Sequence, residues 1–261
     1  MKLFRLGLLA MSLALFTACG NYVEEFTLKA DGSGSYTVYS DIIEGSVEMG
    51  STMATMFSEE ELTQAQKDSV RLGVEAKMWE DFDGEVDSVI NMVSELPDSF
   101  LNYGNNREYA ERMVMFMRGS QEKGYMNIGV EVDYKNGEDF NDFINYLENM
   151  QDSKGSGNAT ILGGLSETKS DASYKFSSKS FGRTVKYTFV ENEEGDKSMG
   201  KMLEMMGEGG TYKTIVHTER KIKKVKGENI VLQEDYKVVF EYPFAASLDG
   251  SVNTDFEIIF K

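Results

Sequence analysis

The chain of 261 residues is 41% hydrophobic and 11% aromatic, enough apolar material for a packed core of one large or two small domains. Its 27 Lys and Arg face 44 Asp and Glu, and the net charge of −17 argues against nucleic acid as a partner, because both are anionic. Only two prolines occur, so the sequence is typical of a folded chain rather than a disordered one.

Residues 1–18 have the pattern of a bacterial signal peptide. Lys2 and Arg5 precede an apolar run over residues 6–16. This run is too short to cross a bilayer, so we do not expect a transmembrane anchor. The small residues Thr17 and Ala18 follow it and precede Cys19, the only cysteine of the chain.

The position of Cys19 resembles the lipobox of bacterial lipoproteins, in which the cysteine thiol takes a diacylglycerol and the chain is cut just before it. That family usually has leucine three residues before the cysteine, where this chain has Phe16. The resemblance implies a mature chain that begins at Cys19 and is held at the cell envelope by its lipid. The outer membrane is the expected location, on either its periplasmic or its outer face. Removal of two basic residues leaves a net charge of −19, which favours a body that stands off anionic headgroups.

The first elements of the mature chain are expected to be a hairpin and a helix. Over residues 20–41, Phe26 and Leu28 alternate with polar residues, and a Gly- and Ser-rich turn over residues 31–34 follows. Residues 45–57 carry methionines at helical spacing. Ser58 and Glu61 then resemble a capping box that opens a polar helix as far as Trp79.

In the middle of the chain we again expect a hairpin followed by a helix. Residues 86–96 fit either a short helix or an extended segment. Residues 107–134 predict a second hairpin from their alternating apolar positions. The next helix is the clearest, because apolar residues follow one another at intervals of three and four after Asn136. These residues are Phe140, Phe143, Ile144, Leu147 and Met150.

The C-terminal part is expected to be rich in strands. Residues 173–190 predict two strands broken near Ser178, a short helix carries Met199 and Met202, and the last fifty residues predict four further strands. These are residues 212–216, 229–232, 237–242 and 255–260, with Tyr236, Val238, Phe240 and Tyr242 facing inward.

The sequence therefore predicts an α+β fold, with antiparallel sheet built from hairpins and interleaved short helices. We divide the chain into the signal peptide 1–18, an N-terminal α+β part 19–151, a flexible loop 152–158 and a strand-rich part 159–261. The Gly- and Ser-rich composition of residues 152–158 indicates the loop. The two parts are expected to pack as one domain.

Several of these pieces resemble uncharacterised lipoproteins of Bacteroidota, loosely similar to the LppM-type extracytoplasmic domain. They are the lipobox, the hairpin turn at residues 31–36, the methionine-bearing helix, and residues 220–225 leading into residues 235–240. The resemblance covers both ends of the chain and not its middle. It implies an envelope α+β domain with lipid-like ligands, and it brings no catalytic signature.

Three groups of methionines allow two interpretations. They are Met49, Met53 and Met56; Met113, Met115 and Met117; and Met199, Met202, Met205 and Met206. Thioethers suit Cu(I), but copper sites usually recruit histidine or cysteine as well, so we expect no metal and no other cofactor. Methionine also lines adaptable apolar surfaces, which favours a pocket for an acyl chain. Its expected lining is Met49, Met53, Met56, Phe140, Phe143, Met199 and Met202.

The remaining candidates have structural interpretations that we prefer. His217 lies in a predicted strand without a Ser or Cys nucleophile nearby, so no triad is expected. Residues 249–255 space oxygen ligands as a calcium loop does, but they lack its later Glu, and a turn between strands is favoured. The basic cluster Arg220 to Lys226 suits a lipid headgroup or an acidic partner, whereas an edge strand protected by lysines is the preferred reading.

The hypothesis from the sequence is a lipid-anchored envelope protein that is not an enzyme and binds a hydrophobic or amphiphilic ligand. The alternative is a structural or protein-interaction module at the envelope. A cavity is expected for the first and an exposed apolar patch for the second.

Overall fold

A computed structural model describes residues 21–58, 62–80, 82–96, 98–102, 104–152, 168–189, 210–248 and 250–261. Cys19, the loop beyond Asp152 and the predicted helix with Met199 and Met202 lie outside these residues. The described part is α+β, as the sequence predicts.

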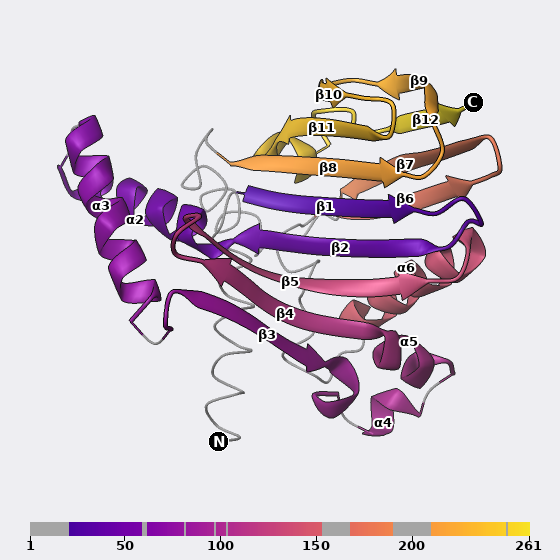
Figure 1. The fold of residues 1–261 in the computed structure, drawn as a ribbon, viewed down its shortest axis with the longest axis horizontal. Helices are drawn as coiled ribbons and strands as arrows, with labels where there is room; N and C mark the ends of the chain where they lie inside the picture. The colour runs from indigo at the N-terminus through magenta and orange to yellow at the C-terminus, as the bar shows by residue number, and fades with distance from the viewer. Residues whose placement is uncertain are drawn as a thin grey trace.

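Two β-sheets form the framework (Figure 1). The larger contains β1 (Asn21–Leu28), β2 (Gly34–Asp41), β3 (Glu85–Asn91), β4 (Met113–Ser120), β5 (Tyr125–Tyr134), β8 (Thr211–Thr218), β10 (Ile230–Gln233) and β11 (Lys237–Pro243). The smaller contains β6 (Thr168–Phe176), β7 (Ser180–Phe189), β9 (Ile222–Gly227) and β12 (Phe256–Phe260).

The strand order joins the two ends of the chain. The larger sheet runs β10-β11-β8-β1-β2-β5-β4-β3, and the smaller runs β6-β7-β12-β9. The pairing of β1 with β8 is parallel, whereas the other described neighbours are antiparallel. Strands β8, β11 and β10 therefore extend the sheet that the first hairpin begins.

Helices occupy both ends of the larger sheet. They are α2 (Ile42–Ser58), α3 (Gln64–Met78), the 3-10 helix η1 (Met92–Ser94), α4 (Asp98–Leu101), α5 (Asn106–Arg112), α6 (Gly137–Asp152) and α8 (Phe244–Leu248). In Figure 1, α2 and α3 project at the left, α4 and α5 lie at the lower right, and α6 lies behind β5.

The main core lies between the larger sheet, the smaller sheet and α6. Phe140 of α6 is fully buried, and five aromatic rings lie within 5.8 Å of its ring centre. These belong to Phe26, Tyr36, Tyr134, Tyr174 and Phe176. A second, smaller cluster packs Ile42, Ile43 and Val47 of α2 with Trp79 against Met126 and Ile128 of β5.

The first hairpin is confirmed. Phe26 and Leu28 of β1 and Tyr36 and Val38 of β2 are buried on one face, because alternate side chains of a strand point the same way. At the start of β2 a close approach requires glycine. A Cβ atom on Gly34 would collide with the backbone oxygen of Thr27 and with the hydroxyl of Tyr134.

The predicted start of the polar helix is wrong. Ser58 ends α2 instead of capping the next helix, and Glu61 lies outside the described residues. The cap is five residues later, where the Gln66 side-chain oxygen accepts hydrogen bonds from the Thr63 N–H at 2.9 Å and the Thr63 hydroxyl at 2.8 Å. A second sequence with capping chemistry therefore begins α3.

The structure decides three further predictions, two on the bounds of strands and one on the direction of a side chain. Residues 86–96 are mainly extended, as β3 followed by η1. The second hairpin is confirmed over β4 and β5, but residues 107–112 belong to α5 and were wrongly included. Tyr236 does not face inward. It precedes β11 and is 52% exposed, whereas Val238, Phe240 and Tyr242 are buried as predicted.

Candidate functional site

A buried ion pair connects the two sheets. Glu24 of β1 and Arg183 of β7 are 2% and 3% exposed, and Arg183 Nη1 donates to Glu24 Oε2. Arg183 Nη2 also donates to the backbone oxygen of Thr254 at 2.8 Å. Its guanidinium carbon lies 5.4 Å from the ring centre of Tyr212 and 5.0 Å from that of Phe256. The cation is thus held by aromatic faces as well as by its carboxylate.

Four hydroxyl groups complete the surroundings of the Glu24 carboxylate. Oε1 accepts from Tyr36 at 3.0 Å and Tyr174 at 2.9 Å, and Oε2 accepts from Tyr212 at 2.5 Å and Thr214 at 3.3 Å. With Arg183, five donors converge on one carboxylate. Such saturation compensates for the loss of water around a buried charge.

The tyrosines of this cluster act as donors and not as bases. Burial raises the pKa of Tyr36, Tyr174 and Tyr212 above the ordinary value, and the charge of Glu24 raises it further. Their hydroxyls therefore stay protonated at neutral pH. A carboxylate saturated by such donors is suited to holding the sheets together and poorly suited to taking a proton from a substrate.

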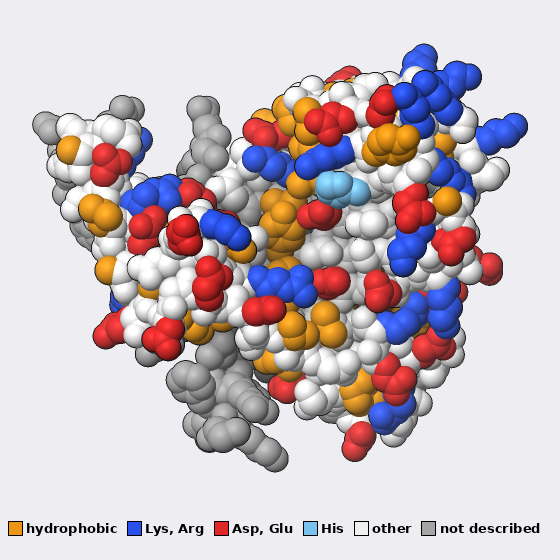
Figure 2. Space-filling view, in the orientation of Figure 1, with side chains coloured by type: hydrophobic (Ala, Val, Ile, Leu, Met, Phe, Trp, Pro, Cys, Tyr) orange, Lys and Arg blue, Asp and Glu red, His pale blue; other side chains and the backbone are white. Residues whose placement is uncertain are grey.

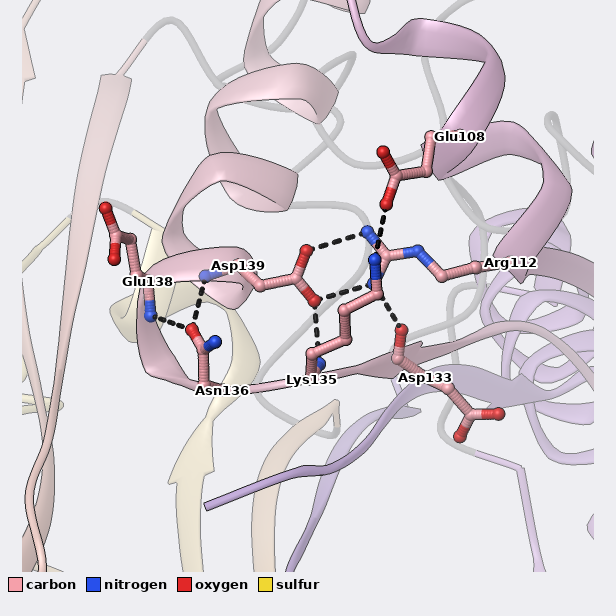
Figure 3. A network of polar contacts seen from close by, with 7 residues as sticks. All are labelled: Glu108, Arg112, Asp133, Lys135, Asn136, Glu138 and Asp139. Atoms are coloured by element: carbon pink, nitrogen blue, oxygen red, sulfur yellow. Dashed lines mark hydrogen bonds and ion pairs between the residues drawn. The ribbon is translucent and has the colours of Figure 1, made fainter. Parts of the chain in front are cut away.

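A second polar network fixes the start of α6 (Figure 3). Arg112 of α5 donates to both carboxylate oxygens of Asp139, at 2.6 and 2.8 Å, and to the backbone oxygen of Asp133 at 3.0 Å. The Asp139 carboxylate also accepts from the Lys135 N–H at 2.7 Å. These contacts connect α5, the end of β5 and α6 through one side chain.

The same network caps the helix. Asn136 Oδ1 accepts from the N–H groups of Glu138 and Asp139, both at 3.0 Å, as expected of an N-cap residue. Burial raises the pKa of the Asp139 carboxyl, but hydrogen bonds from Arg112 and Lys135 outweigh it, and the pKa lies below the usual value. The network therefore has a structural role in placing Phe140.

Of the predicted ligand-binding residues, the structure places two side chains. Phe140 and Phe143 are 0% and 1% exposed, and both pack in the main core beside other aromatic rings. Met49, Met53 and Met56 belong to α2, but their side chains lie outside the described ones, and so do Met199, Met202 and Cys19. Whether these residues meet stays a prediction.

The other sequence candidates occupy structural positions. Met113 and Met115 are buried in the main core, and Met117 packs against the second cluster. His217 Nε2 lies 3.0 Å from Glu25 Oε1. The Asp255 carboxylate accepts from the Val185 N–H at 2.8 Å. Among the described residues, no group of three or more His, Cys, Asp or Glu side chains is placed to hold a metal ion.

The surface with the most unusual composition is formed by residues 220–237, which we call the rim. It contains β9 and β10, each at the edge of its sheet, so the expected position of the basic cluster on an edge strand is confirmed, and the role of its lysines, protection of the edge or contact with an acidic partner, stays a prediction. Of the six large apolar side chains exposed in the described part of the chain, four lie in the rim. They are Ile230 (37% exposed), Val231 (58%), Leu232 (38%) and Tyr236 (52%).

The rim is also basic. It has six Lys and Arg and three Asp and Glu, a charge of +3, while the rest of the chain carries −20. Figure 2 shows Lys and Arg side chains gathered at the upper right, with hydrophobic side chains beside them, at the end of the molecule where β9 lies in Figure 1. Sequence reasoning identified the strand and the lysines. The missed signal was the uninterrupted run Ile230-Val231-Leu232 next to them.

The chain matches no protein-family model, and no curated protein or solved structure shows significant similarity to it. Within the described ranges, none of the helices is long and apolar enough to cross a bilayer. Functional inference therefore depends on the geometry of the chain itself.

Proposed function

We propose that this protein is a lipid-anchored module of the cell envelope that is not an enzyme and contacts another protein through the rim. The observation that supports this most strongly is the coincidence of four exposed apolar side chains with a local charge of +3 in an otherwise acidic chain. Exposed apolar groups beside polar ones are typical of interaction surfaces, because a partner removes them from water.

The proposed anchor is compatible with a free rim. A lipid on Cys19 would attach two residues before Asn21, where β1 begins. Strand β10 is three strands away from β1 in the sheet, which corresponds to about 14 Å at ordinary strand spacing. The body would thus be tethered near the middle of the larger sheet, and its edge would remain available. We place it at the outer membrane on the lipobox resemblance.

The burial of Phe140 and Phe143 favours this proposal over the hydrophobic-ligand hypothesis. Both rings are packed against other core side chains, so they offer no surface to an acyl chain in this conformation. The saturated Glu24 cluster likewise favours a role other than catalysis. An interaction module needs neither a cavity nor a reactive group.

The test compares partner capture by the full chain and two variants, each made with its own signal peptide in a bacterial envelope. The rim variant K223E/K224E/V231D inverts the charge and removes apolar surface. The control L72D changes a side chain of α3 that is 66% exposed. We expect cross-linking in envelope extracts to give a specific partner with the wild type and L72D, and its loss with the rim variant.

Identical capture by all three proteins would contradict the proposal. Native mass spectrometry of the same samples provides the second readout. A lipid mass in excess of the anchor, removed by organic extraction and unaffected by the rim variant, would instead support the hydrophobic-ligand hypothesis.

A further inference from the structure

Among the residues that the structure describes, strand β10 has a neighbour on one edge only, and we call the other its free edge. It is the last strand of the larger sheet, and β11 is its one described neighbour, through the pairs Ile230 with Phe240, Leu232 with Val239 and Gln233 with Val238, with an irregularity in the register between Ile230 and Leu232. All four of its residues are exposed. A strand at a sheet edge presents a row of backbone N–H and C=O groups that lack ladder partners, and these groups accept another extended chain.

These directional groups limit the kind of partner that fits. A bilayer interior supplies no hydrogen bonds to backbone groups, so inserting this edge into lipid is costly. A second copy of the chain is disfavoured as well. Two rims of charge +3 would meet in a symmetric pairing, and two strongly acidic bodies repel each other at long range. An extended segment of a different protein avoids both problems.

The charge around the edge selects the composition of that segment. Lys223 and Lys224 on β9 are exposed, and β9 leads into β10 through a corner at Gly227 and Asn229, both of which have positive φ. Of the three acidic residues of the rim, Asp235 pairs with Lys221 at 2.5 Å, and Glu228 and Glu234 are exposed; Lys226 pairs at 2.6 Å with Glu257 of β12, outside the rim. The lysines that remain favour acidic side chains in the partner.

We infer that the free edge of β10 binds an extended segment of a partner protein as an added β-strand, in which apolar residues alternate with Asp or Glu. Because alternate side chains of a strand share a face, the apolar residues would cover the exposed apolar side chains on one face of β10, and the acidic ones would be attracted by the lysines of the rim. This inference rests on the proposed function and names the mode of binding at the same surface.

The test begins with a random library of 12-residue peptides, displayed on phage and selected on the full chain. We expect enriched peptides to alternate apolar and acidic residues. In solution, such a peptide should protect the amides of residues 230–233 from hydrogen exchange. Methylation of two backbone nitrogens on its pairing edge should weaken binding at least about tenfold, and the same change on the opposite edge should not.

The outcomes separate the two proposals. Peptides that bind with equal affinity after methylation on either edge, or that enrich as helical or proline-rich sequences, overturn strand addition while the rim remains an interaction surface. Failure to enrich any peptide also overturns it. Equal binding of the selected peptide by the wild type and K223E/K224E/V231D overturns both proposals. Self-association detected by analytical ultracentrifugation and abolished by the rim variant assigns the edge to a second copy instead.

Discussion

In most folded proteins charged side chains are exposed and large apolar side chains are buried. The Glu24 cluster and the rim depart from this rule in opposite directions. The first buries a charged pair, and the second exposes apolar side chains. Inside, the chain supplies its own partners, since five donors from four strands reach the Glu24 carboxylate. At the rim, the described part of the chain supplies β11 on one edge of β10 and nothing on the other.

The difference shows which unusual feature concerns folding and which concerns binding. A buried polar group that is fully hydrogen-bonded specifies how the sheets pack. The free-energy cost of removing it from water is offset by hydrogen bonds within the protein. An exposed apolar edge gains stability when something covers it. The first feature should therefore respond to mutation through stability, and the second through association.

The largest expected effect is in the buried pair. Arg183→Met removes the cation and leaves Glu24 as an uncompensated buried charge, so we expect the free energy of unfolding to fall by about 3–5 kcal/mol. Urea denaturation of the wild type and variant measures this. A loss below about 1 kcal/mol would show that the pair is solvated, and the contrast with the rim would be lost.

A double variant tests the mechanism. In E24Q/R183M the neutral amide of Gln still offers an oxygen to the tyrosine hydroxyls, and no unpaired charge remains. We expect it to be more stable than R183M alone. The opposite order would mean that the four hydroxyl donors stabilise the Glu24 carboxylate sufficiently without the guanidinium.

The next effect concerns Asp139 and depends on pH. Its pKa is lower in the folded chain than in the unfolded one, where it is about 4, so its stabilisation is present above that pH and is lost as pH falls through the folded value. Asp139→Asn should cost about 1–2 kcal/mol at pH 7 and progressively less below pH 4. Thermal unfolding between pH 2 and 7 measures the difference. Asp142→Asn, exposed on the same helix, is the control and should show no such convergence.

A smaller effect is expected at the cap of α6. Asn136→Ala removes the acceptor of two backbone N–H groups and should cost about 1 kcal/mol. Hydrogen exchange at the amides of Glu138 and Asp139 should accelerate by the corresponding factor of about five. Asn145→Ala, on an exposed position of the same helix, should leave these rates unchanged.

The smallest effect on stability is expected at the rim. The same substitution at a buried valine of the core serves as the comparison. Val231→Thr should change the unfolding free energy by less than about 0.5 kcal/mol, because the side chain is already in water. The same change at Val38, which is 3% exposed, should cost about 1–3 kcal/mol, because it buries a hydroxyl. Equal costs measured by urea denaturation would show that the rim is covered in solution.

The local sequence pattern was enough to predict most helices and strands. It failed where two patterns of the same kind lay close together. The hairpin of β1 and β2 and the helix α6 followed from periodicities of two and of three to four residues. Ser58 and Thr63 both begin sequences with capping chemistry. Which of them starts a helix depends on how far α2 extends, and α2, whose first turns pack on Met126 and Ile128 of β5, continues through Ser58. No window around Ser58 contains that information.

The cluster at Glu24 was missed for a related reason. In the sequence, Glu24 is one of two adjacent acidic residues in the middle of a strand, and nothing local separates it from Glu25, which pairs with His217 at the surface. The two differ because neighbouring side chains of a strand point to opposite faces. The donors to Glu24 come from positions 12 to 190 residues away.

The sequence by itself determined the types of most elements, the α+β class, the acidic charge and the lysines of an edge strand, because these depend on the order and composition of neighbouring residues. Only the tertiary structure decided that β1 pairs with β8 in parallel, that Glu24 and Arg183 meet between two sheets, and that Ile230, Val231 and Leu232 remain exposed. Those features depend on which strands become neighbours, and the pairing of distant strands is set by the packing of the whole chain.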